Sequence, residues 1–210
     1  NALFSICLCL LEHGDEVIVP ELYYATYPAT VTAGGAKFIS IPTNAGMDFQ
    51  PDTYSIKKAI TPKTRAVLIN SPNNPSGAVY SHETLKSIIS LCRAKGIWLI
   101  SDEVYSEIAP VGFTPIASLT GSHEQTVTIS SLSKSHRMTG WRCGWMVGPK
   151  KLTRHLTNLN ICMNYGIPPF IQDASFIALK KDMDTAKHVK KRLDINRTIL
   201  NEGLEGIEGA

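Results

Sequence analysis

Short apolar runs alternate with longer amphipathic stretches over most of this chain. The apolar runs are rich in Val, Ile and Leu, and we expect strands at Val17–Pro20, Lys37–Ile41, Ala66–Asn70, Ile97–Asp102, Thr126–Ser130 and Cys143–Val147. Strands that are apolar along their whole length are typical of parallel sheets with helices on both faces. The alternation therefore predicts an α/β fold, a three-layer αβα arrangement around a mostly parallel sheet.

The amphipathic stretches between these runs predict helices. They cover Ala2–Glu12, Tyr27–Ala33, Asp52–Ile60 and Ser81–Lys95, and the pattern is helical from Pro149 onward. Ser81 is a good N-cap for its helix, and Gly96 is a typical stop signal at the other end. Sheets of this kind normally bind their ligand at the carboxyl ends of the strands.

Charge and cysteine content exclude several classes of protein. The 21 Lys and Arg against 18 Asp and Glu leave a net charge of +3, and these charges are scattered, so nucleic-acid binding is not supported. The longest apolar run, Ile6–Leu11, is far shorter than the ~20 residues of a membrane span. The five cysteines lie mostly in apolar stretches without zinc-ligand spacing, so we expect reduced, buried thiols, an intracellular protein and no metal site.

Three polar segments fall where predicted strands end. They are Asn70–Gly77, Ser101–Glu107 and Ser130–Trp145. Taken alone, the first is also an ordinary turn, and Asp102 in the second is also an ordinary helix cap or surface acid. An ionised carboxylate at the end of an apolar strand is costly, however, unless a cation meets it.

The third segment has the most specific chemistry. Two serines, Ser131 and Ser133, precede Lys134, and the run Gly140–Gly144 allows Arg142 to return to the same place. Serine hydroxyls and a guanidinium together form a cup for an anion such as phosphate. A lysine among cationic neighbours has its ammonium form disfavoured, which makes the neutral amine available for Schiff-base chemistry. Neither a P-loop nor a dinucleotide-binding glycine motif is present.

These segments, in this order and spacing, resemble a known family. Asn73–Gly77, Asp102–Tyr105, Ser131–Lys134 and Gly140–Trp145 are similar to the successive signatures of class I/II pyridoxal-phosphate-dependent aminotransferases, the fold type I enzymes of the aspartate aminotransferase family. The similarity covers nearly the whole chain. The resemblance implies transamination between an amino acid and a 2-oxo acid, with pyridoxal 5′-phosphate as cofactor, in a cytoplasmic homodimer.

The resemblance also implies catalytic roles. Lys134 would form the Schiff base with the cofactor and then move the substrate proton. Asp102 would pair with the protonated pyridine nitrogen and keep the ring an electron sink. Asn74 and Tyr105 would donate hydrogen bonds to the phenolic oxygen, and Lys134, Asp102 and Tyr105 together form the predicted catalytic set.

The remaining cofactor contacts follow from the same resemblance. Ser131, Ser133 and Arg142 would hold the phosphate. Tyr24 would stack on the pyridine ring, and Tyr27 would lie behind Asp102 as its neighbour. No metal is implied.

The family pattern predicts how the chain divides. Residues 1–150 are expected to form the cofactor-binding large domain without its N-terminal part, and residues 151–210 a helical continuation toward a small domain outside this sequence. The family's phosphate-binding glycine turn is expected just before Asn1, and its substrate-binding arginine after Ala210. We therefore expect the 210 residues alone to be inactive.

Two other functions stay open from the sequence. A pyridoxal-phosphate-dependent β-lyase would use the same ring-binding residues but would release ammonia and pyruvate. A transcription regulator with an aminotransferase-like ligand-sensing domain would need a DNA-binding segment upstream of Asn1. The sequence does not identify the amino donor or acceptor, since a few contacts decide such preferences.

Overall fold

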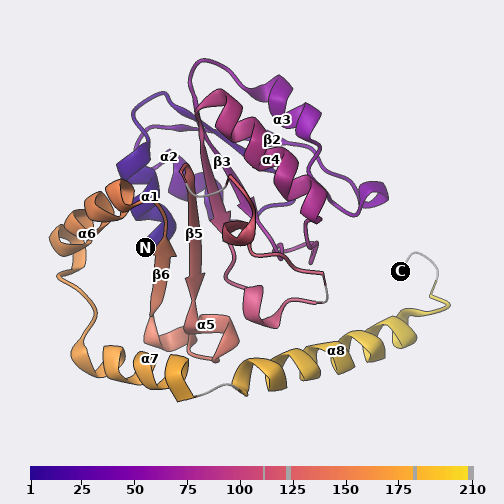
Figure 1. The fold of residues 1–210 in the computed structure, drawn as a ribbon. Helices are drawn as coiled ribbons and strands as arrows, with labels where there is room; N and C mark the ends of the chain where they lie inside the picture. Colours follow the sequence, from indigo (N-terminus) through magenta and orange to yellow (C-terminus); the bar gives the residue numbers. More distant parts are fainter. Residues whose placement is uncertain (111, 122–123, 182–183, 208–210) are drawn as a thin grey trace.

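A six-stranded sheet forms the centre of the molecule (Figure 1). The computed structural model describes residues 1–110, 112–121, 124–181 and 184–207. The strands are β1 (Glu16–Pro20), β2 (Lys37–Ile41), β3 (Thr64–Asn70), β4 (Trp98–Asp102), β5 (Thr126–Ser131) and β6 (Gly144–Val147). Their order is β2-β1-β3-β4-β5-β6, and every pair is parallel except β5 and β6, which are antiparallel. The predicted α/β fold with a mostly parallel sheet is confirmed.

Helices cover both faces of this sheet (Figure 1). They are α1 (Ala2–Leu10), α2 (Tyr27–Thr32), α3 (Thr53–Ala59), α4 (His82–Lys95), α5 (Leu132–Ser135), α6 (Lys150–Asn164), α7 (Pro169–Lys181) and α8 (Thr185–Leu204). Helices α1, α2 and α6 pack together on one face, and α3 and α4 pack on the other. The expected three layers are therefore present.

Successive side chains of the inner strands point into two separate hydrophobic cores, one on each face of the sheet. In β3, Ala66 and Leu68 face the core beneath α1 and α6, while Val67 and Ile69 face the core beneath α4. This alternation follows from the strand period of two, which points neighbouring side chains to opposite faces. A strand segment between two helical layers must therefore be apolar on both faces, as Ala66–Ile69 of β3 are.

The helix boundaries lie within two residues of those expected from the sequence. The hydroxyl oxygen of Ser81 accepts a hydrogen bond from the Thr84 N–H at 3.1 Å, as an N-cap residue does. Gly96 ends the helix in the left-handed conformation, with φ of 66°. The predicted start and stop of α4 are confirmed.

The expectation of five buried thiols is only partly right. Cys7 and Cys92 are buried, and burial raises the pKa of each thiol to about 12. Cys9 and Cys143 are half-buried, and Cys162 is exposed. Cys162 lies on α6 away from the stripe that carries the buried Leu152 and Leu156, and its apolar sequence neighbours Ile161 and Met163 are exposed as well. All five thiols are free.

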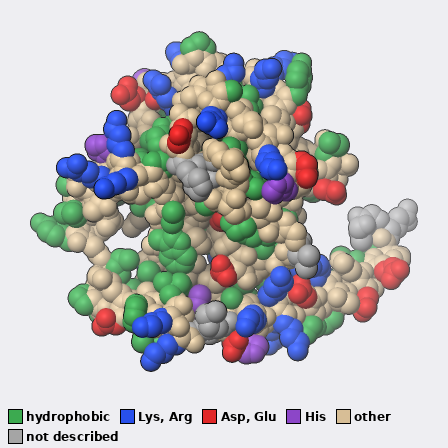
Figure 2. All heavy atoms as spheres, viewed as in Figure 1, with side chains coloured by type: hydrophobic (Ala, Val, Ile, Leu, Met, Phe, Trp, Pro, Cys, Tyr) green, Lys and Arg blue, Asp and Glu red, His purple; other side chains and the backbone are tan. Residues whose placement is uncertain are grey.

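Helices α7 and α8 extend along the edge at which β5 ends (Figure 1). Helix α8 contacts α5 and the 3₁₀ turn Ser106–Ile108 and buries none of its own residues. Charged side chains of both signs are spread over the visible face (Figure 2). Among the described residues, no helix is both long and apolar enough to cross a bilayer.

Candidate active site

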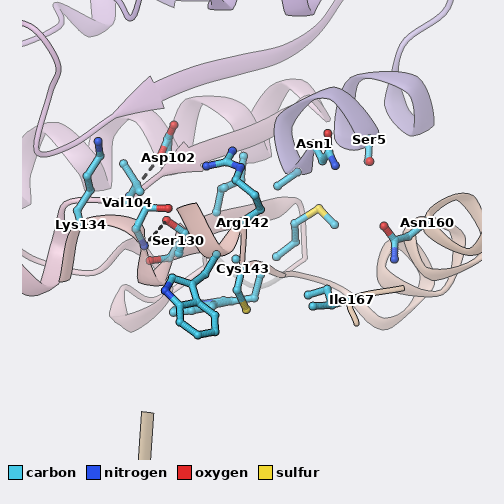
Figure 3. A pocket seen from close by; sticks show the side chains of 18 of the residues that line it. Asn1, Ser5, Asp102, Val104, Ser130, Lys134, Arg142, Cys143, Asn160 and Ile167 are labelled. Atoms are coloured by element: carbon cyan, nitrogen blue, oxygen red, sulfur yellow. Dashed lines mark hydrogen bonds between the residues drawn. The ribbon is translucent and has the colours of Figure 1, made fainter. Parts of the chain in front are cut away.

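A cavity of about 950 Å³ opens at the carboxyl ends of β3, β4 and β5. It is lined by every site residue predicted from the sequence, namely Tyr24, Asn74, Asp102, Tyr105, Ser131, Ser133, Lys134 and Arg142. Figure 3 shows Asp102, Lys134 and Arg142 toward one side of the cavity and Asn160 and Ile167 toward the other. Residues far apart in sequence therefore share one site, at the edge of the sheet where α/β proteins bind ligands.

The end of β4 presents a half-buried carboxylate. Asp102 Oδ2 accepts a hydrogen bond from the Tyr27 hydroxyl at 2.8 Å, and Oδ1 accepts one from the Val104 N–H at 3.2 Å. Burial raises the pKa of Asp102, and these two hydrogen bonds lower it in part. No Lys, Arg or His in the described ranges forms an ion pair with Asp102. A cation bound in the cavity beside Asp102 would favour the ionised form of its carboxylate.

The loop after β3 reaches the same place. Asn74 Nδ2 donates to the Tyr105 hydroxyl oxygen at 3.4 Å, which joins the loop to the segment after β4. Burial raises the pKa of Tyr105, and the bond from Asn74 opposes that effect. Two polar groups that can donate to a single acceptor are therefore held side by side.

Lys134 approaches this pair from β5. The lysine lies on α5, a single turn whose N-cap is Ser131, and the Ser131 hydroxyl accepts from the Ser133 N–H at 3.3 Å. Lys134 Nζ is 5.7 Å from the centroid of the Tyr105 ring. The short helix thus directs the Lys134 amine toward the Tyr105 ring, which follows the carboxyl end of β4.

Strand β6 brings Arg142 back to the end of β5. Gly144 pairs with Ser131, and a Cβ at position 144 would be only 2.8 Å from the Ser130 carbonyl oxygen. Only glycine permits this approach. Arg142 has a positive φ of 54°, and its Nη1 donates to the Thr139 carbonyl oxygen at 2.9 Å. The guanidinium therefore borders the cavity, although no bond joins it to Ser131 or Ser133.

The tyrosines take different positions. Tyr24 and Tyr27 meet edge to face, with ring centroids 5.7 Å apart. Tyr24 is exposed at the cavity, whereas Tyr27 is buried behind Asp102, as the resemblance implies. Tyr23 packs on Phe38 with centroids 4.8 Å apart and lies outside the cavity lining.

Sequence reasoning missed part of the cavity wall. The additional lining residues include Asn1 and Ser5 from α1 and Thr157, Asn160 and Asn164 from α6. The three α6 positions recur at helical spacing, so they share one polar face. That spacing is the only signal in the sequence, and it does not indicate that the face borders this cavity.

The comparison with protein families decides what kind of site this is. The family described as "Aminotransferase class I and II" matches residues 1–209. The chain belongs to the class I and II aminotransferases. Their cofactor is pyridoxal 5′-phosphate.

Several aminotransferases resemble the chain in sequence. It is 44% identical over 209 residues to the arginine–pyruvate transaminase of Pseudomonas aeruginosa. The matched residues make up 99% of this chain and 53% of that protein. It is 34% identical over 212 residues to the aspartate aminotransferase of Geobacillus stearothermophilus, covering 100% of this chain and 54% of that protein. The chain thus spans about half the length of these relatives.

Solved aminotransferase structures share the fold. The aspartate aminotransferase from Thermus thermophilus with maleate has a TM-score of 0.92 at 31% identity, covering 97% of this chain and 54% of that one. The N-succinyldiaminopimelate aminotransferase from Mycobacterium tuberculosis has a TM-score of 0.91 at 34% identity, covering 99% and 55%.

The cavity of this aminotransferase chain has the chemistry that its cofactor needs. Asp102 is a half-buried carboxylate that accepts two hydrogen bonds at the cavity, so it suits a protonated ring nitrogen. Lys134 supplies a primary amine. Arg142 and the amino-terminal end of α1, beginning near Asn1, offer donors for a phosphate group. The residues present therefore fit pyridoxal phosphate.

Proposed function

We propose that the full-length protein containing this chain transfers an amino group from an amino acid to a 2-oxo acid with pyridoxal 5′-phosphate. The observation that carries the proposal is the meeting of Asn74, Asp102 and Lys134 at one cavity, from the ends of three adjacent strands. The aminotransferase relatives support transfer over elimination or ligand sensing.

Each contact to the cofactor is assigned from the resemblance to the family, and the chemistry of each side chain in the cavity supports it. Asp102 would meet the ring nitrogen, and Tyr24 would cover the ring face. The Asn74 amide and the Tyr105 hydroxyl would both donate to the phenolic oxygen of the cofactor, because these two groups already lie next to each other. Ser131, Ser133 and Arg142, with the end of α1, would hold the phosphate. When bound, the cofactor supplies an electron sink for the charge that develops at the substrate Cα.

Lys134 is the proton carrier of this proposal. Its amine would attach the cofactor and, once displaced by substrate, take the proton from Cα and return it at the neighbouring carbon. The one-turn helix that carries Lys134 keeps the amine close to the reacting atoms, since its N-cap at Ser131 continues directly from β5. Positioned acid–base groups of this kind contribute roughly 10²–10⁴-fold to rate.

The organisation of the whole protein follows the same proposal. Residues 1–150 would form the cofactor-binding domain, and residues 151–210 would lead toward a second domain; positions 182–183 and 208–210 of that segment lie outside the described residues. Free thiols suit a cytoplasmic protein. Exposed apolar side chains on and beside α6 and α7, including Tyr165, Phe170 and Phe176, are consistent with burial in a homodimer.

Replacement of Lys134 tests the proposal. In the full-length protein with added pyridoxal phosphate, Lys134→Ala should abolish the visible absorbance of lysine-bound cofactor and reduce transamination at least about 10²-fold. Lys134→Arg keeps the positive charge but should fail in the same way, which separates the need for an amine from the need for a cation. A lysine-bound cofactor band that persists in Lys134→Ala would refute the assignment.

Product analysis separates transfer from elimination. With an amino acid and pyruvate as substrates, transfer yields alanine and a new 2-oxo acid in equal amounts. Release of ammonia and pyruvate from a β-substituted amino acid alone would instead identify a lyase.

A further inference from the structure

Asn70 is the last residue of β3, and its amide connects two parts of the site. The side chain is 3% exposed. Its Nδ2 donates to the Asp102 carbonyl oxygen at 2.9 Å, and its Oδ1 accepts from the Asn74 N–H at 2.8 Å. Both polar ends of one buried amide are therefore bound to the backbone of residues assigned to the cofactor.

The two bonds fix different strands relative to each other. Asn70 and Asp102 pair at the ends of the parallel strands β3 and β4, and the Asp102 carbonyl also accepts from the Ser71 N–H at 3.2 Å. The other end of the Asn70 amide fixes the turn that places the Asn74 side chain on the Tyr105 hydroxyl. Asn70 is thus the shared link between the ring-nitrogen partner and the phenolic-oxygen partners.

We infer that Asn70 is a positioning residue that sets the donors of Asn74 and Tyr105 relative to Asp102. The inference rests on the proposed function. Active-site groups need placement within about 0.5 Å, which side chains alone seldom achieve without supporting hydrogen bonds. Asn70 borders the same cavity, but both polar ends of its side chain are occupied by the backbone of Asp102 and Asn74, so its assigned role is support and not contact with the cofactor.

Asn73 offers a matched control in the same loop. It is 8% exposed, its Nδ2 donates to the Leu22 carbonyl oxygen at 3.0 Å, and its Oδ1 accepts from the Ser76 N–H at 3.0 Å and the Ser76 hydroxyl at 2.7 Å. Asn70 and Asn73 therefore have similar burial and similar bonding. Of these two side chains, only that of Asn70 forms hydrogen bonds with the backbone of Asp102 and Asn74.

The test is a pH titration of the visible absorbance of bound cofactor in the full-length protein. Donors to the phenolic oxygen stabilise its anionic form, so loosening them raises the apparent pKa of that absorbance. We expect Asn70→Leu to raise it by about one unit, and Asn73→Leu to shift it by less than about 0.3 units. An unchanged value in Asn70→Leu, or an equal shift in Asn73→Leu, would overturn the inference.

Asn70→Asp keeps the experiment decisive if the leucine variant does not fold. The aspartate retains an oxygen for the Asn74 N–H but loses the donor to the Asp102 carbonyl. We expect the apparent pKa to rise by about half a unit, because one of the two bonds remains. No rise in this variant contradicts the inference equally.

Failure of the proposed function would look different. A wild-type protein without a lysine-bound cofactor band rejects the function itself. A wild-type band that depends on Lys134, combined with Asn70 variants that titrate like the wild type, rejects only the role of Asn70.

Discussion

The Tyr27 hydroxyl favours the ionised form of Asp102, the carboxylate at the end of β4. Burial favours the protonated form of Asp102, whereas the 2.8 Å bond from Tyr27 and the 3.2 Å bond from the Val104 N–H favour the ionised form. Only the ionised form can pair with a protonated ring nitrogen. At the scale of one residue, the buried Tyr27 phenol would thus act on the proposed cofactor through Asp102.

Tyr27→Phe should weaken cofactor binding. The change removes a hydrogen bond to a charged group, worth about 1.5–3 kcal/mol, so we expect roughly a 10-fold higher Kd for pyridoxal phosphate. Fluorescence titration of the full-length apoprotein measures it. Tyr23→Phe is the control, because Tyr23 packs on Phe38 outside the cavity. Equal Kd values for the two variants would show that the Tyr27 hydroxyl has no such role.

Single residues were predictable where chemistry and strand ends coincide. Asp102 and Lys134 stand out because a carboxylate and an amine directly follow apolar strands. Asn70 gives no such signal, because it begins a segment rich in Asn, Pro, Ser and Gly, and asparagine is an ordinary turn residue in such a segment. Its two-ended hydrogen bonding depends on the pairing of β3 with β4, which sequence does not specify.

Strand β6 is the element on which the anion-binding half of the site depends. Gly144 lets β6 approach β5 closely enough to bring Arg142 to Ser131. The contact involves the Ser130 carbonyl oxygen, a backbone atom that cannot rotate away as a side chain can.

Gly144→Ala should separate these two strands. The added Cβ would lie 2.8 Å from the Ser130 oxygen and 3.0 Å from Ser131 Cβ. We expect a loss of about 1–3 kcal/mol in the free energy of unfolding, measured by urea denaturation, with weaker phosphate binding. Gly140→Ala is a matched control, because nothing lies within 4 Å of its new Cβ. Similar losses in both variants would argue against the close approach.

The existence and type of most elements followed from the sequence, but their spatial order did not. Strand periodicity and caps fix local conformation, as at Ser81 and Gly96. The order β2-β1-β3-β4-β5-β6 and the reversal of β6 arise from packing between distant segments. The exposure of Cys162 also depends on packing between distant segments, because the elements that pack against α6 decide which of its faces is buried.

At the scale of the whole molecule, the pH dependence of stability involves two adjacent acids, the buried Glu103 and the half-buried Asp102. Glu103 is 5% exposed, and its Oε1 accepts from the Ser101 hydroxyl and the Ile116 N–H, both at 3.0 Å. Burial is the main cause that raises the pKa of both Glu103 and Asp102. The folded state therefore holds protons that the unfolded chain has released, so these groups make stability fall as the pH rises.

Glu103→Gln should change that pH dependence. The folded-state pKa of Glu103 is raised, so its contribution is fully present below the unfolded pKa of about 4.3 and is lost as the pH rises through the folded value. Glutamine keeps an acceptor without the charge. The free energy of unfolding of the variant should therefore increase relative to that of the wild type as the pH rises above about 4.3.

Asp52→Asn provides a control of opposite sign. The Ser55 hydroxyl, followed by the Tyr54 N–H, lowers the pKa of this helix-capping carboxylate. Its contribution is present above the unfolded pKa and is lost as the pH falls through the folded value. The free energy of unfolding of the wild type should therefore increase relative to that of Asp52→Asn as the pH rises. Parallel slopes for both variants would contradict the assignments.

The antiparallel pairing of β5 and β6 also affects how the site is assembled along the chain. Lys134 and Arg142 belong to one local hairpin, so bringing them together requires closing only a short loop. Asn74 and Asp102 meet Lys134 only after β3, β4 and β5 have paired across long connections. The part of the proposed site that runs from Ser131 to Arg142 can therefore form early and locally, whereas the ring-binding part, and the contact with the end of α1, exist only once the complete sheet has formed.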